Sequence, residues 1–386
     1  MRTMTPRERV VATLNHQEPD RVPLDLATGG SSSIVPEAYA RLARHYGLAP
    51  SGALVPHMLR LSVVDERILQ DLQIDTRPLY MSPVRSKLRT TALPGHFYDD
   101  WGVLWKEVDT GATVYREVAE SPLATASIAE LDDYPWWPDP HDPDRWAGVR
   151  QHAEQLFHQT DYAVVACPGF NGVWERAWFL CGFRRMMEGV AVERDFVHAV
   201  LRRILELNKA AMGHFLDAVG AYIQVIKLTD DLGIQDGPMI SPRTYREVIQ
   251  PYHKELFGFV KARTRARVFH HSCGSVYRLL PDMLDAGLEV LNPVQVSAQG
   301  MDTRRLKAEF GERLSFWGAI DTQRVLPFGA PGDVRREVER RIADLAPGGG
   351  YVLAPVHNIQ ADVPAENILA MYQHALEVGR YPLESL

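Results

Sequence analysis

Apolar and polar positions follow two alternating patterns along the second half of the chain. From residue 160 onward, short runs rich in β-branched and aromatic residues alternate with stretches whose apolar residues recur at spacings of three and four. The first pattern is typical of buried strands and the second of helices with one apolar face, so their alternation predicts βα units around a parallel sheet. Six strands are predicted in this half, at residues 162–167, 222–228, 267–271, 289–292, 315–318 and 351–354.

Two further strands are predicted nearer the N-terminus. Residues 22–26 and 76–80 have the same β-rich composition and bring the total to eight. Eight βα units predict an α/β fold, a single (β/α)8 TIM barrel that spans residues 1–386. A helical extension precedes the barrel, because Thr5 and Glu8 around a proline form the pattern of a capped helix start. No glycine-rich dinucleotide fingerprint follows any predicted strand, which argues against an open doubly wound sheet.

Residues 84–160 interrupt the alternation. Residues 101–115 alternate in the manner of a β-hairpin, and residues 134–140 hold too many prolines for a helix or a central strand. We expect this region to be an insertion that covers one mouth of the barrel, with residues 84–150 packed over or beside the C-terminal mouth, where they help to exclude water. Its tryptophans are expected to pack against the barrel rather than to bind an aromatic ligand.

Composition and charge exclude several classes of function. The formal net charge is −7 with both signs interspersed, so we expect no nucleic-acid surface. We also expect no membrane contact, because no apolar run approaches the roughly 18 residues that span a bilayer, and the N-terminus lacks the apolar stretch of a signal peptide. Three cysteines, Cys167, Cys181 and Cys273, are typical of free thiols in a reducing compartment. We therefore predict a cytoplasmic protein.

Polar residues follow five of the predicted strands. In barrels of this class the carboxyl ends of the strands build the active site, so polar residues placed there indicate function. The five groups are Thr229-Asp230-Asp231, His271-Ser272-Cys273, Gln295, Asp321 and His357-Asn358.

The sharpest of these signals is the run at residues 269–274. Side chains alternate faces along a strand, so His271 and Cys273 point one way while His270 points the other, to pack or to support the site. An imidazole and a thiolate on one face can bind the same tetrahedral metal ion, with His357 from a later strand as the third ligand. Zinc is the expected metal because it accepts mixed nitrogen and sulfur ligands, and three protein ligands are typical of catalytic zinc.

Gly274 permits a tight turn after this strand. The N-terminus of the helix expected next would favour a thiolate at Cys273. The alternative is a buried cysteine beside a histidine that hydrogen-bonds to the backbone.

The acidic pair Asp230-Asp231 follows the apolar strand at 222–228. Adjacent carboxylates point to opposite faces, and the parity of the strand places Asp231 on the same face as Lys227. Asp231 is expected to act as a general acid or base, as a further metal ligand or as a group that orients the substrate. The alternative is a cap for the helix that begins near Ser241, although about ten residues separate them.

Several motifs together resemble the uroporphyrinogen decarboxylase superfamily. The resemblance covers nearly the whole chain and implies a (β/α)8 barrel. The superfamily includes decarboxylases that act on the acetate arms of uroporphyrinogen without a cofactor, and zinc-dependent methyltransferases that exchange methyl groups between a corrinoid and a thiol or another acceptor. The motifs lie at residues 5–9, 19–23, 230–235, 291–295, 318–323 and 364–367.

Two departures place the chain between these kinds of enzyme. The decarboxylases have an arginine-rich motif that binds the propionates of the substrate, but residues 24–30 contain no arginine. An octacarboxylate needs cationic partners, so we do not expect porphyrin decarboxylation to be the main activity. The pair His271 and Cys273 matches the methyltransferases, but His357 stands where they have a third ligand cysteine and where decarboxylases have a histidine. A His-Cys-His site makes the metal a stronger Lewis acid and favours activation of an oxygen over a thiol.

We therefore expect a zinc-dependent methyltransferase or demethylase of a small methylated substrate. His271, Cys273 and His357 are expected to hold the metal, and Asp231 and His357 to act in catalysis. The expected substrate-binding residues are Asp230, Lys227, Gln295 and Asp321.

The resemblance also implies partners. It implies a corrinoid on a separate protein, since this chain lacks the Asp-x-His-x-x-Gly signature that binds cobalamin. The other expected partners are the small-molecule substrate and a second copy of the chain in a homodimer. Two alternatives stay open: a metal-independent decarboxylase of a porphyrinogen or smaller carboxylate, and a barrel that binds a ligand without chemistry.

Overall fold

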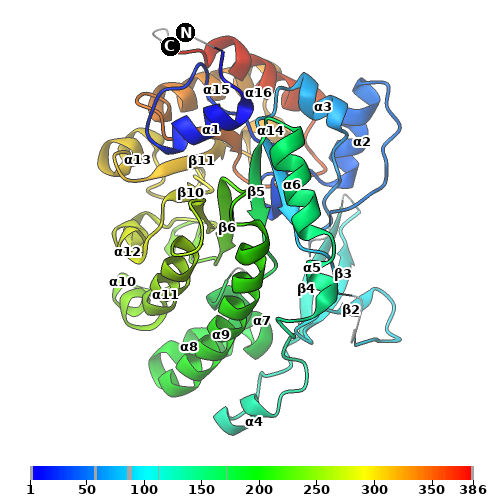
Figure 1. The fold of residues 1–386 in the computed structure, drawn as a ribbon, viewed down its shortest axis with the longest axis vertical. Helices are drawn as coiled ribbons and strands as arrows, with labels where there is room; N and C mark the ends of the chain where they lie inside the picture. The colour runs from blue at the N-terminus through cyan, green and yellow to red at the C-terminus, as the bar shows by residue number, and fades with distance from the viewer. Residues whose placement is uncertain (1–2, 56–58, 85–88, 112, 171, 384–386) are drawn as a thin grey trace.

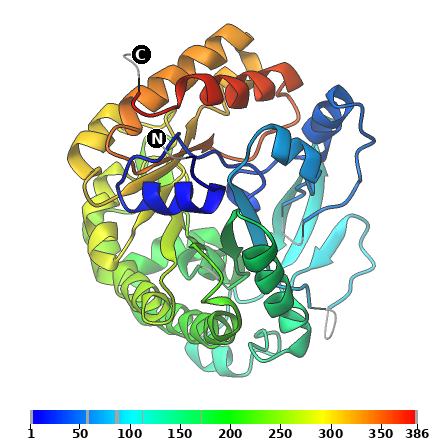
Figure 2. The same ribbon diagram turned by 45° about the horizontal axis from the view of Figure 1, so that its top comes forward.

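A computed structural model describes residues 3–55, 59–84, 89–111, 113–170 and 172–383. Seven parallel strands form one curled sheet, with helices around its outer side (Figures 1 and 2). The prediction of at least six parallel strands in one barrel is confirmed, and each of the seven begins within three residues of its predicted start. In sheet order the strands are β1 (Thr76–Tyr80), β5 (Ala163–Cys167), β6 (Val225–Thr229), β9 (Arg267–His271), β10 (Val290–Asn292), β11 (Ser315–Ile320) and β12 (Tyr351–Pro355).

The eighth predicted strand, at residues 22–26, is not a regular strand in the structure. The segment nevertheless lies in the barrel wall, where that strand was predicted. Asp25 N–H donates to Leu353 O of β12 at 3.0 Å, and Asp75 N–H, directly before β1, donates to Leu24 O at 2.9 Å. The segment therefore joins the two edge strands and closes the barrel. Pro23 has no N–H to donate, and Ala27 turns the chain away with a φ of +75°, so no longer ladder forms.

Helices connect consecutive barrel strands. Within the described residues none of them is long and apolar enough to cross a membrane. Before β1 lie α1 (Pro6–Leu14), the 3-10 turn Gly29–Ser31, α2 (Pro36–His45) and α3 (Glu66–Asp71); after β5 come α7 (Trp174–Cys181), α8 (Phe183–Val192) and α9 (Arg194–Val219). The later connections hold the short hairpin β7 (Gly233–Ile234) and β8 (Gly237–Pro238), α10 (Pro242–Thr244), the π-turn Tyr245–Ile249, α11 (Gln250–Lys261), the 3-10 turn Tyr277–Leu279, α12 (Leu280–Ala286), α13 (Thr303–Phe310), α14 (Val325–Phe328), α15 (Pro331–Leu345) and α16 (Ala365–Val378).

Apolar side chains fill the interior of the barrel at the N-terminal ends of its strands. Helix α1 starts at the predicted capping box of Thr5 and Glu8, and its residues Val10 and Leu14 pack into the N-terminal end of the barrel. This packing makes the N-terminal half of the interior a solid apolar core, and the cavity lies at the other end. The inward-facing strand residues of this core are Ala163, Val165, Cys167, Val225, Phe269, Val290, Trp317, Val352 and Ala354.

The insertion forms a separate small sheet beside the barrel. Strands β2 (His96–Tyr98), β3 (Leu104–Asp109) and β4 (Val114–Glu120) pair antiparallel, which confirms the predicted hairpin (Figure 1). The short helices α4 (Ile128–Asp132) and α5 (Pro143–Trp146) follow. Helix α6 (Val149–Gln159) packs against β1 and β5, so it belongs to the ring of barrel helices.

Candidate functional site

A cavity of about 950 Å³ lies at the carboxyl ends of the barrel strands. This volume is within the range of small-molecule sites. The insertion forms one wall of the cavity through residues such as Phe97, Trp105 and Arg116, which confirms that it lies at the C-terminal mouth. The strand ends and the turns after them contribute Tyr80, Cys167, Lys227, Thr229, Asp231, His271 and His357.

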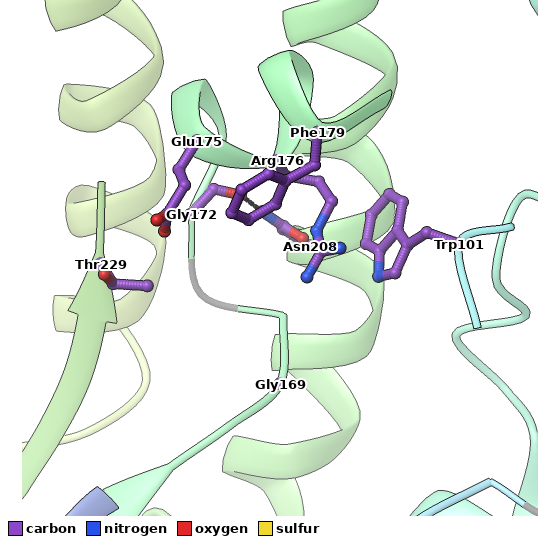
Figure 3. A pocket seen from close by; sticks show the side chains of 8 residues that line it. All are labelled: Trp101, Gly169, Gly172, Glu175, Arg176, Phe179, Asn208 and Thr229. Carbon is purple, nitrogen blue, oxygen red and sulfur yellow. Dashed lines mark hydrogen bonds between the residues drawn. The ribbon is translucent and has the colours of Figure 1, made fainter. Parts of the chain in front are cut away.

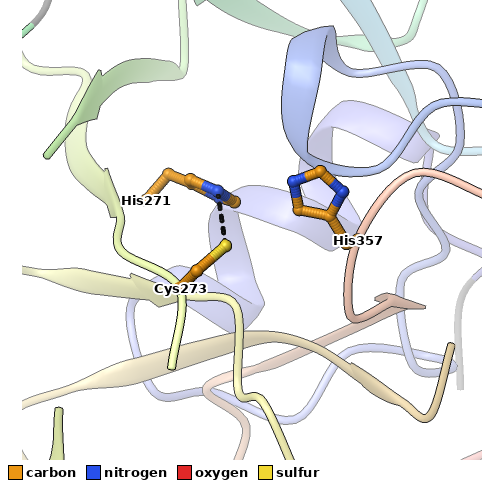
Figure 4. A group of neighbouring side chains, drawn as sticks. All are labelled: His271, Cys273 and His357. Atoms are coloured by element: carbon orange, nitrogen blue, oxygen red, sulfur yellow. Dashed lines mark hydrogen bonds between the residues drawn. The ribbon is translucent and has the colours of Figure 1, made fainter. Parts of the chain in front are cut away.

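Three of the predicted site residues converge on one point of the cavity. His271 ends β9, Cys273 follows two residues later, and His357 lies just after β12 (Figure 4). One ligand atom from each lies within 4.8 Å of the other two, and Cys273 Sγ is 3.4 Å from His271 Nε2. Ligands of a tetrahedral zinc ion are roughly 3.5 Å apart, so this donor set fits zinc in both chemistry and spacing. The predicted convergence is confirmed, and metal binding stays a prediction.

Asn292, at the end of β10, orients the His271 ring. Its Oδ1 lies 2.5 Å from His271 Nδ1, and its Nδ2 donates to the Trp317 carbonyl at 3.1 Å. The second bond places the amide oxygen toward the imidazole, which then carries its proton on Nδ1. The lone pair of Nε2 then points toward Cys273 Sγ, 3.4 Å away. This support of a ligand histidine by a fixed acceptor is common in metal sites.

Both histidines are held in the neutral form that binds metals. Burial and the positive charge of Lys227 lower the pKa of His357 to about 4. The same two causes, with His357 itself, lower the pKa of His271 well below its usual value. Neutral imidazole offers a lone pair at neutral pH.

The surroundings of Cys273 do not favour the thiolate that the sequence led us to expect. Burial and the nearby carboxyl groups of Asp231 and Glu175 raise its pKa well above the usual value. The turn that follows is a short 3-10 segment that begins only at Tyr277, too far along to favour a thiolate at Cys273. Without a bound metal ion, this side chain is therefore a neutral thiol. A metal ion would reverse that balance, because a coordinating thiol loses its proton.

Two carboxyl groups share the wall next to Cys273. Asp231 lines the cavity as the strand parity predicted, and its Oδ1 accepts the Cys273 N–H at 2.8 Å. Burial and the charges of Asp231 and Asp230 raise the pKa of Glu175, while burial and Asp230 raise that of Asp231. At neutral pH the pair holds a proton that it can give up. Glu175 was missed from the sequence because it lies in the first turn of α7, where acidic residues commonly only complement the helix dipole.

Asp230 lies outside the described residues that line the cavity, and its predicted role in substrate binding stays a prediction. Its carboxylate accepts the N–H groups of Val173 at 2.9 Å and Glu175 at 2.6 Å, and bonds to His253 Nε2 at 2.8 Å. It therefore caps a helix, as the alternative held, but the helix is α7 rather than the one that Ser241 caps. His270 lies on the same hidden side, with its ring 5.1 Å from that of His253.

Gln295 and Asp321 also lie outside the described cavity lining, and their predicted contact with substrate stays a prediction. Gln295 Oε1 accepts the Gly274 N–H at 2.7 Å. Asp321 Oδ1 accepts the N–H groups of Gln323 and Arg324 at 2.7 and 3.0 Å. Both side chains brace backbone turns around the site. Of the four residues expected to bind substrate, Lys227 lines the cavity.

The start of α7 is braced from a second side. A small void of about 20 Å³ adjoins the main cavity there, and Asn208 Nδ2 donates to Gly172 O at 2.6 Å across it (Figure 3). Arg176 forms an ion pair with Asp99 at 2.9 Å, which ties α7 to the insertion. These bonds fix the position of Glu175 in the cavity wall.

Residues 103–378 match the uroporphyrinogen decarboxylase (URO-D) family over most of the barrel, including all the predicted site residues. The chain belongs to this family. Two similar curated proteins are both named as enzymes, which supports an enzymatic role for this URO-D family member. A uroporphyrinogen decarboxylase of Aeromonas salmonicida is 23% identical over 285 residues, 69% of this chain and 76% of the relative. A methylcobamide:CoM methyltransferase (MtaA) of Methanosarcina barkeri is 30% identical over 165 residues, 42% of this chain and 44% of the relative.

A solved structure shows the same fold. A methyltransferase from Methanosarcina mazei superposes with a TM-score of 0.63 at 18% identity and covers 97% of this chain and 99% of its own. This likeness extends the shared barrel beyond the residues that match the URO-D family.

Proposed function

We propose that this URO-D family chain is a zinc-dependent methyltransferase or demethylase of a small methylated substrate. The observation that carries the proposal is the convergence of His271, Cys273 and His357 at the cavity, with His271 oriented by Asn292. A catalytic zinc site needs three protein ligands and one side open to substrate, and this group faces a cavity of suitable volume. Zinc held there would act as a Lewis acid on the heteroatom of the substrate or the acceptor.

The acid pair supplies the proton that the reaction requires. When a methyl group leaves a heteroatom as a methyl cation equivalent, the heteroatom keeps the bonding electron pair and gains negative charge. A proton from Asp231 and Glu175 would neutralise that charge in the demethylated product. Burial and the neighbouring carboxyl groups raise the pKa of Glu175 to about 8, which supports this role, since a donor must carry its proton at neutral pH.

The relative named methylcobamide:CoM methyltransferase supports a corrinoid as the second substrate. We propose that a separate protein brings this corrinoid to the cavity mouth. The porphyrin reaction is disfavoured by the charges of the cavity. Its arginines Arg116, Arg145 and Arg176 are all paired with carboxylates, and residues 24–30 hold no arginine, whereas uroporphyrinogen brings eight carboxylates.

Metal content tests the proposal. Purified protein should contain about one zinc ion per chain by elemental analysis, and Cys273→Ala should lose it. Cys181→Ala is the matched control, because Cys181 is a buried cysteine of α7 outside the ligand group. Zinc retained in Cys273→Ala at the level of the control would contradict the site, and wild-type protein that binds no metal would favour the metal-independent decarboxylase.

Activity can be tested with free methylcobalamin as the methyl donor. Its loss of the methyl group changes its absorbance, and simple thiols and phenols serve as acceptors. We expect demethylation by wild-type protein and by Cys181→Ala, and none by Cys273→Ala or chelator-treated protein. A rate that does not depend on the metal would overturn the zinc mechanism.

A further inference from the structure

Lys227 places an ammonium group at the floor of the cavity. It lies on β6 at the level of Phe269, one inward-facing position deeper than the pair of Thr229 and His271. Its side chain is 4% exposed and lines the cavity. Residues two apart on a strand are roughly 6.6 Å apart along it, so the Cα of Lys227 lies about that far below the Cα of Thr229, and its side chain reaches into the cavity from there.

Lys227 has no hydrogen bond or ion pair to any described residue. The other cations of the cavity wall differ from it in this respect. Arg116 pairs with Glu107 at 3.1 Å, Arg145 with Asp100 at 2.6 Å, and Arg176 with Asp99 at 2.9 Å.

The groups closest to Lys227 do not replace an ion-pair partner. The carboxylate of Asp25 attracts Lys227 only from a distance, since its oxygens accept hydrogen bonds from Thr28, Ser32, Thr76 and Trp317 and make no ion pair with the ammonium group. Burial raises the pKa of the Cys167 thiol to about 12, so this neighbour is neutral. Glu175 lines the same cavity and makes no ion pair with Lys227. A buried cation without a partner is costly, and an anion that enters from the cavity would relieve that cost.

The side chains that line the cavity around Lys227 indicate what kind of molecule the rest of the ligand is. Tyr80, Met81, Phe97, Trp105 and Phe179 line the same cavity. These side chains offer aromatic and apolar surface to the body of a ligand whose charged end reaches the floor.

We propose that Lys227 receives the carboxylate of a small organic acid with an aromatic or apolar body, and that this acid is the substrate. The placement of its methylated heteroatom beside His271, Cys273 and His357 rests on the proposed function, whereas the carboxylate site on Lys227 does not.

Calorimetric titration with matched acids and amides tests the carboxylate site. The probes are benzoate and phenylacetate against benzamide and phenylacetamide, each titrated into zinc-loaded and chelator-treated protein. Wild-type protein should bind at least one acid about tenfold or more tightly than its amide in both metal states, as expected for a charged hydrogen bond. Lys227→Met should abolish this preference. Lys254→Met, an exposed lysine of α11 outside the cavity, should retain it.

Three outcomes would overturn the proposal. They are equal binding of acids and amides by wild-type protein, a preference that survives in Lys227→Met, and a preference that disappears with the metal, since the acid would then bind zinc. Protein that binds no zinc but keeps the preference would refute the proposed function and leave the carboxylate site intact.

Thermal unfolding separates ligand binding from a structural role. Ligand-free Lys227→Met should unfold at the same temperature as wild-type protein or higher, because methionine fills similar space without a buried charge. If Lys227 were a structural counter-ion, the variant would unfold at a lower temperature and keep the preference for acids, which would overturn the proposal.

Discussion

At the scale of single residues, the candidate metal site depends on the hydrogen-bond partners that orient its ligands. The His271 ring is held by Asn292, which the Trp317 carbonyl holds in turn. His270, its neighbour in the chain, faces away from the cavity and packs against His253 and Phe257. The two adjacent histidines therefore have different surroundings and should respond differently to substitution.

Replacement of Asn292 should weaken zinc binding without removing a ligand. Asn292→Ala removes the acceptor for His271 Nδ1–H, and we expect about a 10- to 100-fold loss in zinc affinity. Asn292→Asp keeps an acceptor oxygen at that place and should restore most of it. Competition with a chromophoric chelator measures both, and equal affinities in all three proteins would show that Asn292 does not orient the ring.

Replacement of His270 should leave zinc bound. His270→Gln changes a side chain on the far face of β9, where burial and His253 lower its pKa to about 3. We expect the zinc content of wild-type protein, measured alongside His271→Gln, which should contain none. Zinc lost from both variants would place His270 in the metal site.

At the scale of elements, one carboxylate connects β6 to α7. Asp230 accepts two N–H groups at the start of α7 and also bonds to His253 of α11. The neighbouring Asp231 faces the cavity instead. Asp230 is thus a positioning residue that holds the start of α7, and with it Glu175, against the strand ends.

Loss of this cap should destabilise the fold. Asp230→Asn replaces one acceptor oxygen by a donor, so we expect a loss of about 2 kcal/mol or more in the free energy of unfolding. Asp217→Asn, on the exposed side of α9, should change it by less than about 0.5 kcal/mol. Urea unfolding compares the three proteins, and equal midpoints for both variants would contradict the capping role.

The same cap should fail in acid. Burial alone would raise the pKa of Asp230, but the hydrogen bond and charge of His253 outweigh it and lower the pKa below the usual value. A carboxylate with a lowered folded pKa stabilises the protein above the unfolded value of about 3.9, and this contribution falls as the pH drops through the folded pKa. The difference in unfolding free energy between wild type and Asp230→Asn should therefore be constant from pH 5 to 7 and shrink below about pH 4. A difference that grows as the pH falls would show the opposite shift.

At the scale of the whole molecule, buried ion pairs as well as backbone hydrogen bonds hold the closing segment of the barrel in place. Arg9 of α1 and Arg21 both pair with Asp75, at 2.5 and 2.7 Å, and the Leu24 N–H donates to the same carboxylate at 2.8 Å. This one buried side chain ties the N-terminal extension and the closing segment to β1. The predicted homodimer and cytoplasmic location stay predictions at this scale.

Removal of that carboxylate should have a large effect on stability. Asp75→Ala leaves the buried Arg21 guanidinium without its carboxylate partner, while Arg9 keeps Asp20, and we expect a loss of about 3–5 kcal/mol in unfolding free energy. Asp285→Ala, on the exposed side of α12, serves as the control and should change little. A small effect at Asp75, measured by urea unfolding, would show that backbone bonds alone close the barrel.

The sequence by itself determined the seven strands of the sheet and the residues of the candidate metal site. Both rest on local rules, since apolar periodicity marks strands and helices and the parity of a strand decides which side chains share a face. Parity is why Asp231, His271 and Cys273 were assigned to the cavity and His270 to the opposite side. The same rules placed residues 22–26 in the barrel, but Pro23 prevented a regular strand there.

Only the tertiary structure decided which polar residues are free to meet a ligand. Asp230, Gln295 and Asp321 stand at strand ends like the true lining residues, yet their oxygens are occupied by backbone N–H groups. Glu175 enters the site because α7 is anchored to β6 some 55 residues further along the chain, and Asn292 acts on a histidine 21 residues before it. Hydrogen-bond partners of this kind are chosen by the packing of distant elements, so no local pattern could reveal them.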